Sequence, residues 1–306
     1  MQEYNYWKKV IKMLGTCVVF LILILFSNFL STVNILFGSE VVLLFAGAII
    51  PGIWGSTIEL ADNSNWKTSQ RKLKRAGVLQ DDTLIRISFA YLYRIKVDDR
   101  YFLILNNRSE KYQPVGGAYK FYEEEGEYLT RHIPAESDNR IPVDEVTKRA
   151  YRLLVKNKDL RRFVKRFNKT SCRENVNNLS REFEEEIFTT GILNKDTFGN
   201  LSYRYIGRHM TEVEYGRVFN HFELLLADIL EVKLTEKQEE LFRELMRLSS
   251  DKYCFASADT IKAHGVKYGT QELKDDIANH TPKILTENTD DLTNRNKIKD
   301  IITVRL

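Results

Sequence analysis

An uncharged apolar run near the amino terminus is the feature that most constrains this chain. The stretch MLGTCVVFLILILFSNFL, residues 13–30, contains no charged side chain. A helix rises about 1.5 Å per residue, so these eighteen residues cover about 27 Å, close to the roughly 30 Å of a bilayer's hydrocarbon core. The run therefore predicts a membrane-spanning helix.

A second apolar stretch follows at once. Residues 33–55 read VNILFGSEVVLLFAGAIIPGIWG, interrupted by Glu40 and closed by Pro51 and Gly52. The first run is too long for a cleaved signal peptide, and no small-x-small cleavage site is evident. We therefore expect residues 1–60 to form a two-helix transmembrane hairpin. Glu40 then either marks the far interface or lies inside the membrane on a helix-helix or pore surface.

Basic residues flank this hairpin on both sides. Three lysines precede the first span and five cations follow the second, while the connecting turn has no Lys or Arg: Lys8, Lys9, Lys12, Lys67, Arg71, Lys72, Lys74 and Arg75. Because positive flanks stay in the cytoplasm, both ends are predicted to be cytoplasmic. Residues 61–80 are expected to be a basic juxtamembrane linker that suits anionic headgroups.

The remaining chain has the pattern of a mixed α+β domain. Residues 82–108 predict two strands joined by a turn at Asp98 and Asp99, and residues 201–232 predict two more. The segment after Thr235 begins with a capping box completed by Gln238, which predicts a helix. The three cysteines lie far apart, which indicates a reduced compartment without structural zinc or disulfides.

Residues 131–173 have a distinctly basic composition. They contain 13 Lys or Arg against 5 Asp or Glu. An apolar stripe with helical spacing predicts one or two basic amphipathic helices: Val146, Ala150, Leu153, Leu160, Val164 and Phe167. Such a face is either solvated or a docking surface for an anion such as a nucleotide phosphate or a lipid headgroup.

A cluster of glutamates follows in NLSREFEEEIF, residues 178–188. Leu179, Phe183 and Ile187 repeat every four residues and predict a helix. On another face the spacing of Glu182, Glu185 and Glu186 brings three carboxylates together. This arrangement is typical either of a solvated acidic face or of a divalent cation site.

The order of these pieces resembles the Nudix family, whose box reads G-x5-E-x7-R-E-U-x-E-E-x-G-U, with U a bulky aliphatic residue. Gly117 and Glu123 match the first part. REFEEE at 181–186 matches the second through Arg181, Glu182, Phe183, Glu185 and Glu186. The resemblance implies that Glu182, Glu185 and Glu186 hold Mg²⁺ and that Arg181 orients a helix carboxylate.

The match departs from the family pattern in three places. The seven-residue spacer is replaced by Glu124 to Ser180, so the basic segment is an insertion in the box, and the final glycine, Gly191, comes late. Gly126 and Glu127 also compete with Glu123 for the position of the first carboxylate. The first carboxylate therefore stays open, and no catalytic residue is assigned.

A nucleotide pocket is expected around the glycine pair. Gly116 and Gly117 permit a close backbone approach, aromatic rings stack on bases, and cations meet phosphates. The candidate residues are Gly116, Gly117, Tyr91, Tyr93, Tyr112, Tyr119, Arg161 and Arg162. The alternative is that the four tyrosines are ordinary strand and core aromatics.

The whole chain resembles the two-transmembrane Nudix effectors of CBASS, bacterial antiphage systems in which a cyclic-nucleotide synthase signals infection. The implied fold is α+β: an N-terminal two-helix transmembrane hairpin (1–60), the basic linker (61–80), and a divergent Nudix-type α/β/α sandwich (81–285) with a basic helical insertion (131–173). A polar, loose tail (286–306) is expected to follow.

The resemblance implies a multi-pass effector of the bacterial inner membrane. Its cytoplasmic domain would sense a cyclic nucleotide, self-associate as a homo-oligomer and disrupt the bilayer in abortive infection, with no nucleic-acid polymer as partner. The rival hypothesis is a membrane-anchored, Mg²⁺-dependent Nudix hydrolase of nucleoside diphosphate derivatives. A third is a scaffold that binds a protein partner.

Overall fold

The computed structural model describes residues 2–32, 40–42, 44–45, 49, 65–138, 148–216, 219–265, 276–286, 292 and 300–306. The chain forms two compact units, Met1–Thr68 and Ser69–Leu306.

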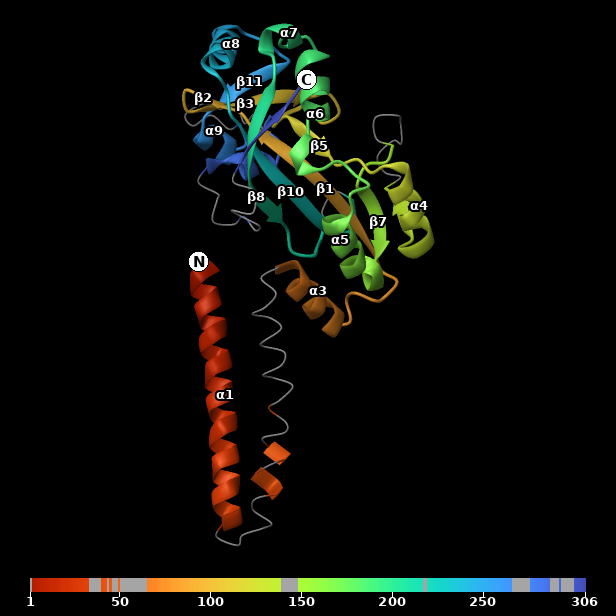
Figure 1. Ribbon diagram of the computed structural model, residues 1–306, viewed down its shortest axis with the longest axis vertical. Coiled ribbons are helices and arrows are strands. Elements are labelled where there is room, and N and C mark those ends of the chain that lie inside the picture. The colour runs from red at the N-terminus through yellow and green to blue at the C-terminus, as the bar shows by residue number, and fades with distance from the viewer. Residues whose placement is uncertain are drawn as a thin grey trace. The chain divides into compact units, whose positions relative to one another are not determined.

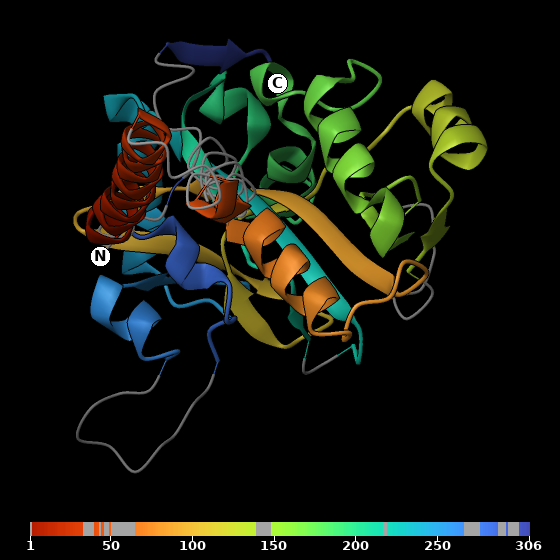
Figure 2. The ribbon, with the colours of Figure 1, turned by 90° about the horizontal axis from the view of Figure 1, so that it is seen from below.

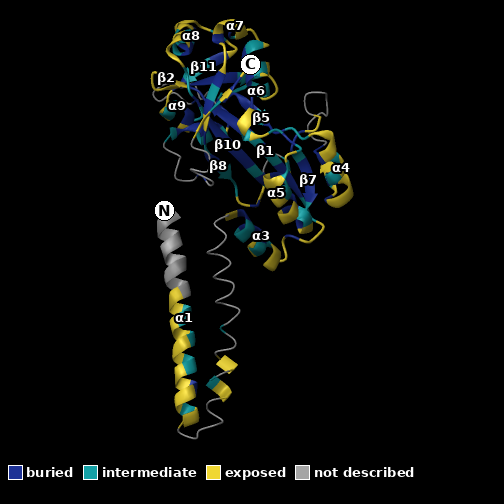
Figure 3. Ribbon diagram, viewed as in Figure 1, coloured by how far each residue is buried: buried dark blue, intermediate teal, exposed yellow. Residues whose placement is uncertain are grey.

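The first unit contains one long helix, α1 (Gln2–Thr32) (Figure 1). Within α1, Leu14–Thr32 is 19 residues long and apolar enough to cross a membrane. Leu21, Leu25 and Phe29 expose more than half of their surface, and Figure 3 shows the exposed positions along the helix. By length and composition alone the helix suits a lipid environment, although a signal sequence meets the same criterion.

The predicted second span lies largely outside the described residues. Of the stretch 33–55, the structure describes 40–42, 44–45 and 49, all of them helical. Glu40 is among these and is exposed. The described part of the chain contains no second helix long enough to cross a bilayer. The hairpin and the role of Glu40 therefore stay predictions.

The predicted basic linker is in part a helix, α3 (Asn65–Arg75). In its second half the Gln70 amide donates to the Asn157 Oδ1 at 2.7 Å, and Ser69 Oγ accepts from the backbone N–H of Val213 at 2.7 Å. Both Ser69 and Gln70 are buried. This half of α3 is thus part of the folded domain.

The second unit is built on two sheets. The larger, sheet A, has the strand order β12 (Ile301–Val304), β8 (Leu201–Met210), β10 (Phe222–Val232), β1 (Leu84–Arg94), β7 (Arg152–Lys156) and β6 (Ala135–Ser137), with β5 (Gly116–Ala118) paired to β1 and β9 (Glu214–Tyr215) to β10. The smaller, sheet B, has the order β11 (Tyr253–Ala256), β3 (Arg100–Asn106) and β2 (Lys96–Val97), with β4 (Lys111–Gln113) paired to β3.

The helices of this unit cover both sheets. They are α4 (Glu123–His132), α5 (Leu160–Lys169), α6 (Arg181–Phe183), α7 (Lys195–Phe198), α8 (Glu236–Arg247) and α9 (Ala258–Lys262), with short turns η1 (Asn157–Asp159), η2 (Val176–Asn178) and η4 (Thr281–Ile284) and a π-helical segment η3 (Glu184–Phe188). The capping box predicted at Thr235 and Gln238 is confirmed at the start of α8.

Strands β1 and β10 form the centre of sheet A and run parallel, side by side (Figure 2). On one face of β1, Phe89 packs against Phe167 of α5 with ring centroids 4.7 Å apart. On the other face, Leu92 joins a buried cluster with Leu103 of sheet B and Ile284 of η4. Figure 3 shows that the central strands are largely buried. We call these the α5 face and the η4 face of sheet A.

The predicted strand pair at 82–108 exists, but its two halves belong to different sheets. Asp98 and Asp99 form the turn at positive φ, 47° and 61°, a region that Asp tolerates better than most residues. The turn joins β2 to β3 in sheet B, whereas β1 pairs with β10 in sheet A. Periodicity predicts that a segment is a strand but not which distant strand pairs with it, so the pairing of β1 with β10 could not be predicted from the sequence.

Two other predictions need correction. In the segment 131–173, α5 confirms one basic amphipathic helix, but Leu153 of the predicted stripe lies in β7, paired with Ile87 of β1. Val146, the first residue of the predicted stripe, lies outside the described residues. In the tail, β12 pairs with β8 and Val304 is buried, because the edge of β8 offers free hydrogen-bonding groups.

A charged network stabilises the α5 face. Asp228 of β10 is fully buried and accepts two hydrogen bonds from Arg208, at 2.7 and 2.8 Å. The hydroxyls of Tyr119 and Tyr205 also donate to it, at 2.7 and 3.1 Å. The carboxylate is thus fully satisfied, which is the condition under which a buried charge is tolerated.

We expect Asp228→Asn to lower the free energy of unfolding by about 3 to 5 kcal/mol, because it leaves the Arg208 charge buried without a counter-charge. Asp82→Asn is the matched control, since Asp82 pairs with Lys158 on the exposed surface and should change stability little. Chemical unfolding of the full chain in detergent measures both. Equal effects of the two substitutions would contradict the role given to Asp228.

Candidate functional site

The glycine pair forms strand β5 and lies against the glutamate helix. Gly117 is opposite Tyr91 of β1, and Gly116 is opposite Leu92. A Cβ atom on Gly117 would lie 2.0 Å from Oε1 of Glu182, and one on Gly116 would lie 2.2 Å from the carbonyl oxygen of Tyr91. Only glycine therefore allows the helix carboxylate, the loop and β1 to approach this closely.

The glutamate helix consists of α6 followed by the π-helical η3. Its hydrogen bonds include Thr189 N–H to Glu184 O at 3.0 Å, five residues apart. Phe183 and Ile187 are fully buried and anchor one side, as their spacing predicted. Single π-helical turns are rare in proteins, and those that exist are found frequently at functional sites.

Arg181 holds this helix to its surroundings. Its Nη1 donates to Glu182 Oε1 at 2.6 Å, and its Nε donates to Glu174 Oε1 at 2.7 Å. Its Nη2 donates to the carbonyl oxygen of Ala118 at 3.0 Å. Hydrogen bonds to these carboxylates raise the pKa of Arg181, outweighing the opposite effect of burial. The predicted orienting role agrees with this placement.

Glu182 and Glu186 lie together beneath the glycine strand. Glu186 Oε2 accepts from the Gly116 N–H at 2.8 Å. Burial raises the pKa of Glu186 well above its ordinary range, and the charge of Glu182 adds to the effect. Burial also raises the pKa of Glu182, although Arg181 opposes it. Two partly buried carboxyl groups thus share one small region.

Glu185 differs from its two neighbours. Almost half of its side chain is exposed, and its nearest ion-pair partner is Arg181 at 3.4 Å. Among the described residues, no group of three or more His, Cys, Asp or Glu side chains is arranged to hold a metal ion. Arg181 and the Gly116 N–H each bind one oxygen of Glu182 and Glu186, and the three-glutamate Mg²⁺ site stays a prediction.

Glu174 is a site residue that the sequence analysis missed. It precedes Arg181 by seven positions, and its Oε2 accepts from the backbone N–H of Lys120 at 2.8 Å. It therefore occupies the position beside Arg181 for which Glu123 and Glu127 were considered. The sequence contained a signal for this role, because the distance from Glu174 to Arg181 nearly matches the E-x7-R spacing of the family box. It is one residue shorter, so Glu174 does not match the box as written.

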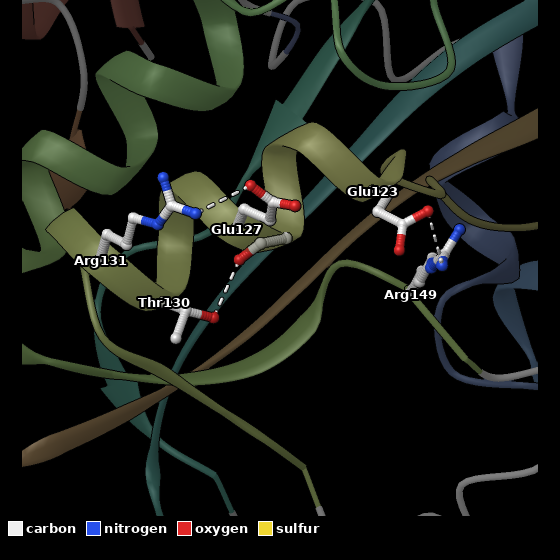
Figure 4. A pocket seen from close by; sticks show the side chains of 6 residues that line it. Glu123, Glu127, Thr130, Arg131 and Arg149 are labelled. Carbon is white, nitrogen blue, oxygen red and sulfur yellow. Dashed lines mark hydrogen bonds and ion pairs between the residues drawn. The ribbon is translucent and has the colours of Figure 1, made fainter.

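Glu123 and Glu127 lie instead on α4, beside a shallow depression of about 430 Å³ (Figure 4). Glu123 is 3.7 Å from Arg149, and Glu127 is 3.1 Å from Arg131. These four side chains are largely exposed and already paired. The depression therefore offers no unpaired buried group to fix a ligand, and the glycine strand is the better candidate.

Three of the four candidate tyrosines lie in the core. Tyr91, Tyr93 and Tyr119 are buried, and the ring centroids of Tyr91 and Tyr119 are 5.1 Å apart. Tyr93 also packs against Phe183 at 5.4 Å. This placement agrees with the alternative of ordinary core aromatics, because no ring face is open to a base. Tyr112 is half-buried on β4, where its hydroxyl donates to the Asp251 carbonyl at 3.1 Å.

The two candidate arginines lie on α5 and contact other elements. Arg161 Nε donates to Gln70 Oε1 at 2.9 Å. Arg162 donates to the carbonyl oxygen of His132 and lies 3.9 Å from Asp159. Neither contacts the glycine strand or the glutamate helix in these interactions. The structure thus brings together Gly116, Gly117, Arg181, Glu182 and Glu186 from the predicted set.

We expect Gly117→Ala to displace the Glu182 side chain and to lower the free energy of unfolding by about 1 to 3 kcal/mol, as overpacking does. The control is Gly126→Ala in α4, where a Cβ would approach only the Phe121 ring edge, at 3.3 Å. That change should be neutral or stabilising by up to about 1 kcal/mol. Thermal unfolding of both variants measures the difference.

The raised pKa of Glu186 predicts a pH dependence of stability. A carboxyl group whose pKa rises on folding stabilises the fold below its unfolded value, 4.5, and loses this contribution as pH rises through the folded pKa. In EDTA, we expect the free energy of unfolding to fall from about pH 4.5 toward neutral pH, and Glu186→Gln to remove part of that fall.

Glu184→Gln is the control on the same helix. Burial alone would raise the pKa of Glu184, but hydrogen bonds from Lys195 and Ser180 lower it. The Glu184 contribution is therefore present at neutral pH and lost as pH falls, so its removal should reduce stability at pH 7. An identical pH profile for the two variants would contradict the assignment.

The chain was compared with protein families, curated proteins and solved structures. The family described as SMODS-associated NUDIX domain matches residues 84–285, which include β1, β5 and the glutamate helix. No curated protein and no solved structure matches. Nudix domains in general use divalent metals such as Mg²⁺.

The matched region is about two thirds of the chain and contains every residue of the site built above. The Nudix resemblance derived from the spacing of Gly117, Arg181 and the helix glutamates is confirmed by this match. The chain therefore belongs to the SMODS-associated NUDIX domain family, the Nudix proteins of the type associated with CBASS antiphage defence.

Proposed function

We propose that this protein is a membrane effector of a bacterial CBASS system. Its Nudix domain senses a cyclic nucleotide, and binding promotes self-association that disrupts the inner membrane and aborts infection. The proposal places the protein in the membrane as a multi-pass hairpin with both termini in the cytoplasm.

One observation supports this function above others. A Nudix domain of the CBASS-associated type occurs in the same chain as an exposed apolar helix, Leu14–Thr32. A freely diffusing hydrolase has no use for such a helix, because exposed apolar surface of this extent is unfavourable in water. Contact with lipid removes this apolar surface from water.

The geometry of the site favours ligand binding over hydrolysis. Arg181 and the Gly116 N–H engage oxygens of Glu182 and Glu186 within the protein. Catalytic carboxylates must instead be directed at the reacting group with tight geometry. A domain that keeps the Nudix frame while its carboxylates stabilise the frame itself suits a sensor.

Binding can be coupled to the membrane by population shift. A ligand that binds an associated form more tightly than a monomer moves the equilibrium toward association. Gathered apolar helices then replace lipid contacts by protein contacts over a small area, which perturbs the bilayer. The mechanism requires only that the ligand distinguish the two forms.

A liposome leakage assay tests the proposal. Full-length protein in dye-filled vesicles should release dye only when a matching cyclic di- or trinucleotide is added. Leu21→Arg should abolish release, because a cation at the centre of a spanning helix costs about 2.5 to 3.5 kcal/mol. Nucleotide binding by this variant should be unchanged.

Thr32→Arg is the matched control, since it places the same charge at the end of the apolar stretch, where it reaches the interface. It should leak as the wild type does. Absence of leakage with every cyclic di- and trinucleotide would refute the effector function.

The alternative is a membrane-anchored, Mg²⁺-dependent hydrolase of nucleoside diphosphate derivatives. The proximity of Glu182 and Glu186 favours it, because a divalent cation would relieve the repulsion between their carboxylates. Release of phosphate or nucleoside monophosphate that requires Mg²⁺ and disappears in Glu186→Gln, but persists in Glu184→Gln, would establish this function instead.

A further inference from the structure

The η4 face of sheet A carries polar residues beside its apolar cluster. Arg152 of β7 is the antiparallel partner of Ser88 of β1, so both side chains project to the same face. Leu92 lies four residues beyond Ser88 and packs with Ile284 on that face. Arg152 therefore belongs to the η4 face, where sheet B and η4 cover the strands.

The η4 segment brings two further basic residues to this face. His280 precedes η4, and Lys283 lies within it. The segment is fixed in place by two contacts to sheet A. The His209 ring of β8 hydrogen-bonds the Lys283 carbonyl oxygen at 3.0 Å, and the Arg94 guanidinium of β1 donates to the Leu285 carbonyl at 3.0 Å.

His280 lies within electrostatic reach of both Lys283 and Arg152. Burial lowers the pKa of His280 to about 4, and the positive charges of Lys283 and Arg152 contribute to the shift. Burial also lowers the pKa of Arg152 and of Lys283, and for Lys283 the charge of Glu214 opposes the effect without forming a close ion pair. We call Arg152, His280 and Lys283 the basic cluster.

Within the described part of the chain, none of these three side chains forms a hydrogen bond or a close ion pair. The Thr281 hydroxyl, in the same segment, is buried and also has no hydrogen-bond partner among the described residues. Partly buried cations without partners are unfavourable, since burial removes hydration and nothing replaces it.

Other buried arginines of the domain have close acceptors, and two of them are paired with carboxylates. Arg86, the nearest example on the same face of β1, lies 2.6 Å from Asp138 and 3.0 Å from Glu223. On the α5 face, Arg208 is paired with Asp228 at 2.7 Å. The basic cluster departs from this pattern, and a departure that costs stability is expected where a ligand supplies the missing charge.

The cluster also lies within electrostatic reach of the glutamate helix. Burial has the largest effect on the pKa of Arg152, and the charge of Glu182 is the main influence that opposes it. Arg152 thus connects the η4 face with the site built from Gly117 and Glu182. A ligand on the cluster would be sensed at that helix through this interaction.

We propose that Arg152, His280 and Lys283 form an anion site that binds the phosphate groups of a nucleotide. The inference rests on the proposed sensing function, which it deepens by assigning phosphate recognition to the η4 face instead of Arg161 and Arg162. The planar guanidinium suits two phosphate oxygens at once, the ammonium acts as a point charge, and a neutral imidazole donates one N–H.

The test compares Arg152→Gln and Lys283→Gln with Lys165→Gln, an exposed lysine of α5 outside the cluster. Thermal unfolding of the full-length protein in detergent is measured alone, with a panel of cyclic di- and trinucleotides, and with inorganic pyrophosphate. Without ligand, both cluster variants should unfold at or above the wild-type midpoint, because each removes a partly buried cation that has no close ion pair among the residues the structure describes.

With the matching nucleotide, the wild type and Lys165→Gln should unfold at a higher temperature, because a ligand bound to the folded state stabilises it. The cluster variants should lose this shift and bind at least tenfold more weakly by titration calorimetry. Binding should also weaken with added salt, as expected for phosphate contacts made by cations.

The outcomes separate the two proposals. If the cluster variants bind a cyclic nucleotide as tightly as the wild type does, the anion site is refuted and the sensing function stands. If no cyclic nucleotide binds but pyrophosphate stabilises the wild type and not the variants, the site stands and the sensing function fails. A lower midpoint of the ligand-free variants, or a wild type that neither ligand stabilises, overturns the site.

Discussion

The three-way contact of Arg181 is the interaction on which the site depends. One guanidinium joins the glutamate helix through Glu182, the loop after α5 through Glu174, and the glycine strand through the Ala118 carbonyl. Arg has the planar set of donors needed to hold three elements at fixed angles, which Lys lacks. Without this cation, the carboxylates of Glu174 and of the glutamate helix would meet in a poorly hydrated region and repel one another.

Sheet A separates two kinds of polar chemistry. On the α5 face, the buried carboxylate of Asp228 is satisfied by Arg208 and two tyrosines, which stabilises the core. On the η4 face, the basic cluster has charges without partners among the described residues. A partly buried cation without a close carboxylate costs stability, so the basic cluster suits a ligand, whereas the Asp228 network and the Arg86 pairs with Asp138 and Glu223 stabilise the fold.

The sequence predicted local features well and pairing poorly. The turn at Asp98 and Asp99, the capping box at Thr235 and the helix α5 follow from local patterns and are confirmed. The strand β7, the edge strand β12 and the role of Glu174 were missed, because each depends on a partner distant in sequence. The unusually long insertion hid Glu174 by separating it from Gly117.

The sequence by itself determined that an apolar helix begins the chain and that a Nudix-type domain follows, since hydropathy and the spacing of Gly117, Arg181 and the helix glutamates are local properties. Only the tertiary structure decided which groups meet. It buried Tyr91, Tyr93 and Tyr119 in the core, directed Glu182 and Glu186 toward the glycine strand, and gathered Arg152 with His280 and Lys283. The physical reason is that strand pairing and burial act between residues far apart in sequence, and they set which charges are hydrated, paired or left for a ligand.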